Sequence, residues 1–259
     1  MKIAVRNIVK SFPHNGANLR VLDGVTLYAR EGEFVTILGP SGCGKSTLFN
    51  IIAGLLSPDA GEIWIDGNPV PDGRGHVAYM QQKDLLLPWR TVLENAILGL
   101  EVQGIPREEA RVRARDLLAR VGLQGFERAY PSQLSGGMRQ RVALVRTVLT
   151  GKEILLLDEP FGALDAMTRM VLQQYILRMW EEFRRTVLFV THDIEEAVLL
   201  SDRIYVLSSR PAHVKEEVAV DLPRPRQVTD PSFVALKGRI LALIQDEIKE
   251  AFAHAREMV

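Results

Sequence analysis

The sequence predicts an α/β fold built on a parallel β-sheet. In the second half of the chain, apolar runs of strand length alternate with helical patterns, which is typical of a parallel sheet with helical crossovers. A glycine-rich loop follows one apolar run directly, as at the carboxyl end of a buried strand. A mostly helical stretch, about residues 91–150, interrupts the pattern, so we expect it to be inserted into the α/β body.

The first ninety residues consist mainly of strand patterns separated by Gly, Pro and Asp turns. The strands expected there are Lys2–Val9, Val21–Leu27, Glu33–Leu38, Glu62–Asp66 and Val77–Met80. The helical stretch contains Val92–Leu100, Arg107–Val121 and a third run from Ser135. Beyond it we expect strands at Glu153–Leu157, Thr186–Val190 and Arg203–Leu207, with helices at Ala166–Phe183 and Ile194–Leu200.

The C-terminal part differs in character, so we expect a main domain over residues 1–210 and an extension over 211–259. Pro211–Pro231 has the prolines of an extended connector. After it, apolar residues recur at three- and four-residue spacing, which predicts an amphipathic helix: Phe233, Leu236, Ile240, Leu243, Ile244, Ile248 and Phe252. Its polar face mixes acidic and basic residues, which favours packing on the body or on a partner subunit over binding to a membrane surface.

The composition narrows the function. The 259 residues carry 32 basic and 32 acidic side chains, and this lack of a basic excess argues against a nucleic-acid partner. The single cysteine, Cys43, excludes an intramolecular disulfide and fits a reducing compartment. No apolar run has the length of a signal peptide or of a spanning helix, which needs about 18–20 residues. We therefore expect a soluble chain whose membrane role, if it has one, is peripheral.

The glycine-rich loop has the pattern G-x-x-x-x-G-K-[ST], which predicts a phosphate-binding loop. Its residues are Gly39, Pro40, Ser41, Gly42, Cys43, Gly44, Lys45, Ser46 and Thr47. Glycines let the backbone approach phosphate closely, and the following helix adds N–H donors and partial positive charge. Lys45 can bridge the β- and γ-phosphates and Ser46 can ligate Mg²⁺. For Cys43 we prefer a small loop filler to a catalytic thiol.

A second nucleotide element is the apolar run 154–157 followed by Asp158 and Glu159. A buried strand that ends in Asp delivers a carboxylate beside Mg²⁺ at the carboxyl edge of the sheet. Glu159, one residue later, is the candidate base that polarises the attacking water. An apolar run ending in Asp-Glu is weak evidence by itself, but it gains weight beside a phosphate loop.

The segment Leu134-Ser135-Gly136-Gly137-Met138-Arg139-Gln140-Arg141 resembles the signature of ABC ATPases. Physically, Ser135, Gly136 and Gly137 open a helix and form another anion-binding helix N-terminus. The resemblance implies that the signature of one subunit closes over ATP bound to the phosphate loop of another. The competent enzyme would then be a head-to-tail homodimer enclosing two ATP molecules.

Four further positions match the same family in order. Phe12 matches the aromatic residue that stacks on adenine, and Gln82 the glutamine that senses Mg²⁺ and the attacking water. Gln81 leaves a one-residue ambiguity there, which the distance to Pro88-Trp89 resolves toward Gln82. Asp165, in Ala163-Leu164-Asp165, matches the loop that contacts the partner subunit, and His192 the histidine that holds the γ-phosphate. The implied fold is a P-loop NTPase with a parallel core sheet, an N-terminal antiparallel β subdomain and an inserted α-helical subdomain.

Two segments resemble one subfamily, the ATPases of nitrate, alkanesulfonate, taurine and bicarbonate importers. They are residues 85–92, LLLPWRTV, and the tail with Arg210-Pro211 and 221–226, DLPRPR. This resemblance implies a permease partner at the cytoplasmic face of the inner membrane and, indirectly, a solute-binding protein. Leu-Pro-Trp is also compatible with ordinary packing where a strand joins a helix. The solute class rests on family analogy alone.

Two other classes remain as alternatives. An ABC ATPase of DNA repair or translation would carry long coiled coils or two cassettes, and neither is present in this sequence. A small-molecule kinase or GTPase would explain the phosphate loop but would leave the signature, Asp165 and His192 unexplained. The sequence thus favours an ATPase that drives transport, with ATP and Mg²⁺ as its cofactors.

Overall fold

A computed structural model of the chain describes residues 1–162 and 164–257, with side chains up to residue 245. Ala163, which belongs to the predicted partner-contact loop, lies outside the described residues. The chain divides into two compact units. Unit 1 consists of Met1–His76 and Arg185–Val259, and unit 2 of Val77–Arg184. The predicted extension, 211–259, therefore belongs to the same unit as the N-terminal strands.

Unit 1 contains an antiparallel sheet in the order β2-β1-β4-β5. Its strands are β1 (Ile3–His14), β2 (Ala17–Ala29), β4 (Ala60–Ile65) and β5 (Asn68–Val70). The central strand β1 pairs Ile3 with Ala29 on one side and Ile65 on the other. This sheet confirms the predicted N-terminal antiparallel subdomain, although β1 and β2 are longer than predicted. The short strand β5 was not predicted, because Pro69 in its middle weakens a strand pattern.

The second sheet of unit 1 carries the parallel core. Its strands are β3 (Phe34–Leu38), β8 (Thr186–Thr191), β9 (Arg203–Leu207) and β10 (Val214–Ala219), with helices α1 (Lys45–Ile52) and α7 (Ile194–Leu200) in the connections. β3 lies between β8 and β9 and runs parallel to both. All residues of β3, β8 and β9 are buried, as expected of strands covered on both faces. The predicted core strands are confirmed within one residue of their ends.

The expected connector over Pro211–Pro231 is corrected in part, because β10 lies within it. β10 pairs antiparallel with β9, with Val218 opposite Ile204. The strand can form because it contains no proline. Beyond it, the guanidinium of Arg226 caps the C-terminal end of α7 by donating to the carbonyl oxygens of Val198, Leu199 and Ser201. It also donates to the carbonyl oxygens of Val220 and Leu222, which follow β10.

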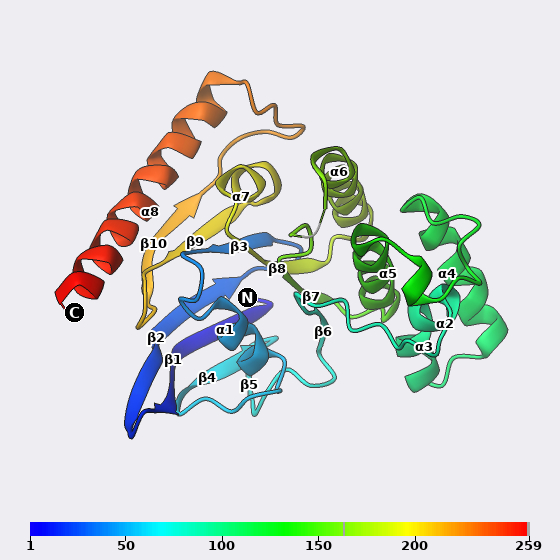
Figure 1. The fold of residues 1–259 in the computed structure, drawn as a ribbon, viewed down its shortest axis with the longest axis horizontal. Coiled ribbons are helices and arrows are strands. Elements are labelled where there is room, and N and C mark those ends of the chain that lie inside the picture. The colour runs from blue at the N-terminus through cyan, green and yellow to red at the C-terminus, as the bar shows by residue number, and fades with distance from the viewer. Residues whose placement is uncertain (163, 258–259) are drawn as a thin grey trace. The chain divides into compact units, whose positions relative to one another are not determined.

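The C-terminal helix α8 (Pro231–Glu257) packs on its own unit, beside α7 and β9 (Figure 1). Phe233 and Ile240 are fully buried in one cluster with Val218 and Val220. The predicted amphipathic helix is therefore confirmed as a packing helix, while the side chains of Ile248 and Phe252 lie outside those described. Among the described residues, no helix is long and apolar enough to cross a membrane.

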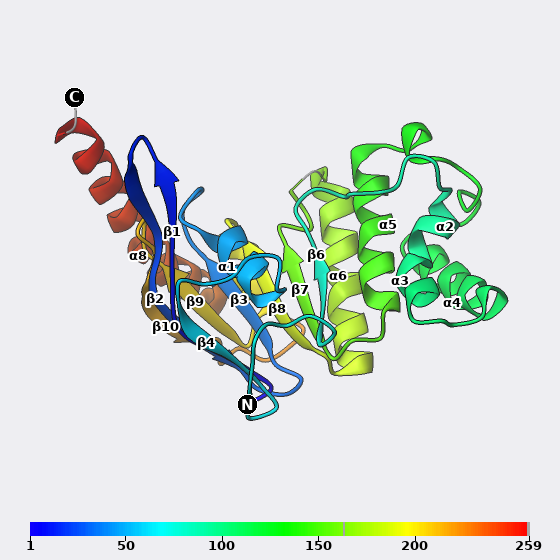
Figure 2. The same ribbon diagram turned by 90° about the horizontal axis from the view of Figure 1, so that it is seen from below.

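Unit 2 combines a parallel strand pair with helices. The strands are β6 (Val77–Met80) and β7 (Ile154–Asp158), and the helices are α2 (Val92–Ala96), α3 (Leu98–Val102), α4 (Arg107–Arg120), the 3₁₀ turn η1 (Pro131–Gln133), α5 (Gly136–Leu149) and α6 (Ala166–Phe183). α5 contacts β6 as well as α2, α3 and α4, so it joins the strands to the small helices (Figure 2). The single helix predicted over Val92–Leu100 is wrong: it is divided at Ile97. Gly99, in the second part, lets the backbone approach Thr150 too closely for a Cβ.

Candidate functional site

At two positions of the phosphate loop, residues 39–47, the backbone adopts a conformation that favours glycine. Gly42 has φ +77° and Gly44 has φ +126°, in the region that residues with a Cβ rarely adopt. A Cβ at Gly44 would come within 2.8 Å of Leu22 and 2.9 Å of Val21. Gly44, a fixed glycine of the sequence pattern, and Gly42, at one of its variable positions, are therefore both required by the backbone geometry of the loop.

Lys45 is buried, with 5% of its surface exposed. Its ammonium donates to the carbonyl oxygens of Gly39 (2.8 Å) and Pro40 (2.9 Å), both in the same loop. The cation is thus held inside the curve of the loop rather than in solvent. An anion bound by the loop would meet a positive charge already in place, which lowers the cost of organising the site.

The loop ends at the N-terminus of α1, where Gly44 is the N-cap and provides no side-chain cap. In the described structure, the first N–H groups of α1 therefore depend on a partner other than a capping side chain. Such N–H groups, with the positive end of the helix dipole, are well suited to phosphate. Ser46 is exposed and Thr47 half-buried in this first turn. The residues present thus fit the phosphate tail of a nucleotide, and the hydroxyl of Ser46 is an oxygen donor of the kind Mg²⁺ prefers.

Two more predicted residues lie in unit 1. Phe12 is half-buried on β1, with the ammonium of Lys10 5.7 Å from its ring centroid. A ring that is partly open on a strand can stack on a base. His192 is exposed between the end of β8 and Asp193, which caps α7 by accepting from the N–H groups of Glu195 and Glu196. The cap fixes the turn that carries His192.

In unit 2, Asp158 ends β7 and is 1% exposed. The hydroxyl of Tyr79, on the neighbouring strand β6, donates to its Oδ2 over 3.3 Å. Burial and the nearby Asp158 carboxylate raise the pKa of Tyr79 well above its ordinary value, so the hydroxyl keeps its proton and remains a donor. A carboxylate oriented in this way is a suitable Mg²⁺ ligand.

Glu159 follows immediately and has φ +46°, which is uncommon for a residue with a Cβ. Such strain is found at functional sites, where the surrounding structure holds it. The side-chain amide of Gln82 donates to Glu159 Oε2 over 3.1 Å. The structure therefore brings together Gln82, Asp158 and Glu159, three residues that the sequence analysis assigned to metal and water, at the ends of the paired strands β6 and β7.

The signature residues open α5 as predicted. Ser135 is exposed and is the N-cap, with its Oγ accepting from the N–H of Met138 over 3.2 Å. A Cβ at Gly137 would come within 2.8 Å of Leu164, so this glycine permits close contact with the loop that contains Leu164, which was predicted to contact a partner subunit. Asp165 caps α6 by accepting from Thr168 N–H over 3.0 Å. That hydrogen bond lowers the pKa of Asp165, which keeps the exposed carboxyl charged.

The loop after Gln82 is tied to the signature helix α5. The Gln140 amide donates to the carbonyl of Gln82 over 2.9 Å. Arg139 pairs with the Asp84 carboxylate over 3.0 Å, and Arg146 donates to the carbonyls of Asp84 (2.6 Å) and Leu85 (2.8 Å). A displacement of α5 would therefore be transmitted directly to this loop.

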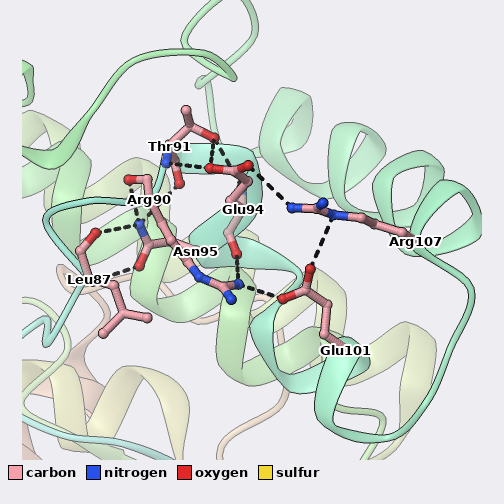
Figure 3. A network of polar contacts seen from close by, with 7 residues as sticks. All are labelled: Leu87, Arg90, Thr91, Glu94, Asn95, Glu101 and Arg107. Atoms are coloured by element: carbon pink, nitrogen blue, oxygen red, sulfur yellow. Dashed lines mark hydrogen bonds and ion pairs between the residues drawn. The ribbon is translucent and has the colours of Figure 1, made fainter.

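The segment 85–92 that follows is held by a buried amide (Figure 3). The side chain of Asn95 is fully buried and accepts from Leu87 N–H over 2.7 Å, while it donates to the carbonyls of Leu87, Arg90 and Thr91. Around it, Arg90 pairs with Glu101, Arg107 pairs with Glu94 and Glu101, and Thr91 forms a capping box with Glu94. Trp89 is 71% exposed and belongs to the segment that these contacts hold in place.

The residues that orient the site carry no recognisable signal in the sequence. Tyr79 lies in a predicted strand, but no pattern singled it out as the partner of Asp158. Gln140 and Arg139 were quoted as part of the signature without a role, and their contacts with the loop after Gln82 depend on tertiary structure. The only sequence signal for these contacts is the presence of a guanidinium and an amide, Arg139 and Gln140, shortly after the signature glycines.

Comparison with known proteins identifies relatives of this chain. Residues 22–162 match the ABC transporter family. An uncharacterised ABC transporter ATP-binding protein of Methanocaldococcus jannaschii is 48% identical over 248 residues, 96% of this chain and 93% of the relative. An aliphatic sulfonates import ATP-binding protein of Bacillus cereus is 41% identical over 241 residues, 93% of this chain and 95% of the relative.

Among solved structures, a dimeric ATP-binding cassette in a post-hydrolysis state, bound to ADP and Pi, is 34% identical and has a TM-score of 0.78. The similarity covers 85% of this chain and 100% of that cassette. A dimeric structure described as a bacterial ABC transporter cassette matches equally well, with 35% identity and a TM-score of 0.78. The likeness thus extends over both units of the fold.

Proposed function

The chain belongs to the ABC transporter family of ATP-binding subunits, and from this premise we propose that it hydrolyses ATP to drive a separate permease that imports a small solute. ATP binding and ATPase activity follow from the family. The observation that carries the catalytic assignment is the Gln82–Glu159 hydrogen bond beside the buried Asp158. A carboxylate held by an amide and next to a buried carboxylate supports a role for this group in activating water beside a metal ion.

We assign the roles within the site as follows. The phosphate loop, residues 39–47, with Lys45, binds the phosphates, and Phe12 stacks on the base. Ser46, Asp158 and Gln82 would hold Mg²⁺, which would neutralise negative charge on the phosphates. Glu159 is the base that takes the proton of the attacking water, and His192 holds the γ-phosphate. All the assigned metal ligands are oxygen donors, in keeping with the preference of Mg²⁺.

We propose that the active form is a head-to-tail homodimer, in which Ser135, Gly136, Gly137 and Asp165 of one subunit face the ATP of the other. The supporting observations are the exposed cap residues Ser135 and Asp165 and the dimeric cassettes that resemble this chain. Since an exposed helix N-terminus favours an anion, α5 can complete a site on another copy.

The test is a variant that binds ATP without consuming it. Glu159→Gln should bind ATP, lose roughly 100-fold or more of kcat, and elute as a dimer from size-exclusion chromatography only with ATP and Mg²⁺. Lys45→Ala in the same background should remain monomeric, because it weakens phosphate binding. Hydrolysis by Glu159→Gln at the parent rate would show that Glu159 is not the base.

For the permease contact we propose the segment 85–92, with Trp89 at its centre. A large exposed aromatic ring on a rigid support is typical of residues that anchor an interface. Through this contact the chain would lie at the cytoplasmic face of the cell membrane as a peripheral subunit. The solute we propose is small, of the nitrate, sulfonate, taurine or bicarbonate type. This choice is supported by the aliphatic sulfonates import ATP-binding protein among the relatives and by the segments 85–92 and 221–226. A solute-binding protein would deliver it.

A further inference from the structure

The turn between β9 and β10 is closed by its own hydrogen bonds. The N–H of Ser208 donates to the carbonyl of His213 over 3.0 Å. The N–H of His213 donates in return to the Ser208 hydroxyl, also over 3.0 Å. Ser208 is buried at the base of the turn. The intervening residues are therefore held in one conformation by backbone and hydroxyl contacts rather than left as an open loop.

This turn is also fastened to β2, next to the phosphate loop. Ala212 is fully buried, its N–H donates to the carbonyl of Val21 over 2.9 Å, and its carbonyl accepts from Asp23 N–H over 2.8 Å. Val21 is one of the two side chains that leave no room for a Cβ at Gly44. The same stretch of β2 thus supports the turn on one side and the end of the phosphate loop on the other.

The start of the phosphate loop touches the same structure. A Cβ at Gly39 would lie 3.1 Å from the Cβ of Leu207, the last residue of β9. The loop is consequently in contact with the β9–β10 region at its beginning and with β2 at its end. Its exposed middle, residues 41 and 42, is the part that these contacts do not support.

Arg210, at the tip of the turn, reaches that middle. Its Nη2 donates to the carbonyl oxygen of Gly42 over 2.5 Å. Gly42 has φ +77°, so its peptide orientation is not set by side-chain sterics. A phosphate-binding loop has to direct its N–H groups toward the anion, and therefore its carbonyls away from it. A charged donor on a carbonyl of the loop fixes that orientation more strongly than a neutral one.

We propose that Arg210 is a positioning residue of the phosphate loop, holding the Gly42 carbonyl so that the loop is already shaped for phosphate before nucleotide binds. The proposal rests on the proposed function, since it deepens the role of the same loop. Removal of Arg210 should loosen the middle of the loop, raise the KM for ATP and leave kcat nearly unchanged.

Cys43 provides a reporter for this conformation. It is the single cysteine of the sequence, it lies next to Gly42, and it is 1% exposed. Burial raises the pKa of its thiol, whereas the charges of Lys45 and Arg210 lower it. Loosening of the loop would expose the thiol and speed its alkylation. Loss of the Arg210 charge alone would act in the opposite direction, because it disfavours the reactive thiolate.

The experiment measures the rate of Cys43 alkylation by N-ethylmaleimide in nucleotide-free protein, followed by mass spectrometry. Arg210→Ala should be alkylated about tenfold faster than the parent, the factor at the low end of what a hydrogen bond from a charged group is worth. Arg210→Gln, which keeps a donor but loses the charge, should lie closer to the parent than the alanine variant. The KM for ATP should rise in Arg210→Ala by a similar factor.

Arg74→Ala is the matched control. It removes an exposed guanidinium of the same unit that is bound to Asp72, and it should keep the parent alkylation rate. An unchanged or slower rate in Arg210→Ala would overturn the proposal, and a slower rate would show that Arg210 acts only through its charge. If Glu159→Gln hydrolysed ATP at the parent rate while Arg210→Ala still reacted faster, the proposed catalytic assignment would fail and the effect of Arg210 on the loop conformation would stand.

Discussion

The amide Nε2 of Gln82 donates a 3.1 Å hydrogen bond to Oε2 of Glu159. This contact joins the end of β6 to the residue after β7, where Glu159 has the left-handed φ of +46°. A base whose backbone is strained and whose side chain is held by an amide has little freedom to leave its position. The orientation of the proposed base therefore depends on the residue that also leads into the segment 85–92.

Gln82→Ala should lower kcat by about tenfold, as part of the 10²–10⁴ that a positioned base contributes, while the KM for ATP changes little. The reason is that Glu159 would lose its orienting donor but keep its carboxylate. Steady-state ATPase assays on purified protein measure both constants. Gln81→Ala is the neighbouring control and should behave like the parent. The reverse order, with Gln81 the sensitive residue, would move the assignment by one position.

Ser135→Arg should reduce hydrolysis by roughly 100-fold, comparable to the loss of a donor at a developing charge. ATP binding by the single chain should remain largely intact, because each chain binds ATP through its own phosphate loop, whereas its Ser135 faces the ATP of the other copy. Fluorescent-nucleotide titration and phosphate release measure the two properties. Ser132→Arg, which adds the same charge at an exposed serine of η1, should leave hydrolysis near the parent rate. Loss of ATP binding in Ser135→Arg would contradict the shared-site geometry.

A cysteine at Trp89, in a Cys43→Ser background, should cross-link to a cytoplasmic loop of the permease. Trp89 is 71% exposed, and the buried Asn95 amide beneath its segment keeps it in place. The measurement is the covalent product on gels of membranes that contain both proteins. A cysteine at Phe126, which is 42% exposed in the same unit, is the control and should give no product. Absence of cross-links from all of Leu87, Pro88 and Trp89 would refute the docking assignment.

Arg226→Ala should lower the free energy of unfolding by about 2–4 kcal/mol, since five carbonyl oxygens lose a charged donor. Burial, and then the charge of Arg224, lower the pKa of Arg226 to about 10, so the side chain is still a cation at neutral pH. Urea unfolding measures the difference. Arg239→Ala, which removes a surface pairing with Glu216, should cost less than about 1 kcal/mol. Equal effects of the two variants would show that the contacts of Arg226 do not stabilise the unit.

Much of the fold is predictable because strong local signals coincide with tertiary demands. The strand Val77–Met80 and the helices Ala166–Phe183 and Ile194–Leu200 have the predicted ends. Asp165 and Asp193 cap the two helices, so the start of each is encoded by a residue type that prefers that position. The phosphate loop was predictable for a similar reason, because its glycines lie where the backbone has a positive φ or a close neighbour.

What could not be predicted depends on contacts between distant residues. β10 lies among prolines, and only its pairing with β9 identifies it as a strand. Arg226 belongs to a proline-rich tail, and nothing in that sequence indicates that its guanidinium bonds to the carbonyls of α7. Likewise, Tyr79 and Arg210 act on Asp158 and Gly42 across 79 and 168 residues of sequence. No periodicity or motif encodes such pairs.

The division of the chain has a consequence for its synthesis. β3 pairs with β8 in register, with Val35 beside Leu188, whereas Val77–Arg184 forms a unit of its own. During synthesis on the ribosome, the whole of that unit is made before β8 and β9, the strands that pair with β3, emerge. Unit 2 is therefore free to fold first, and the strand that precedes the phosphate loop gains its neighbours β8 and β9 only after that unit has been synthesised.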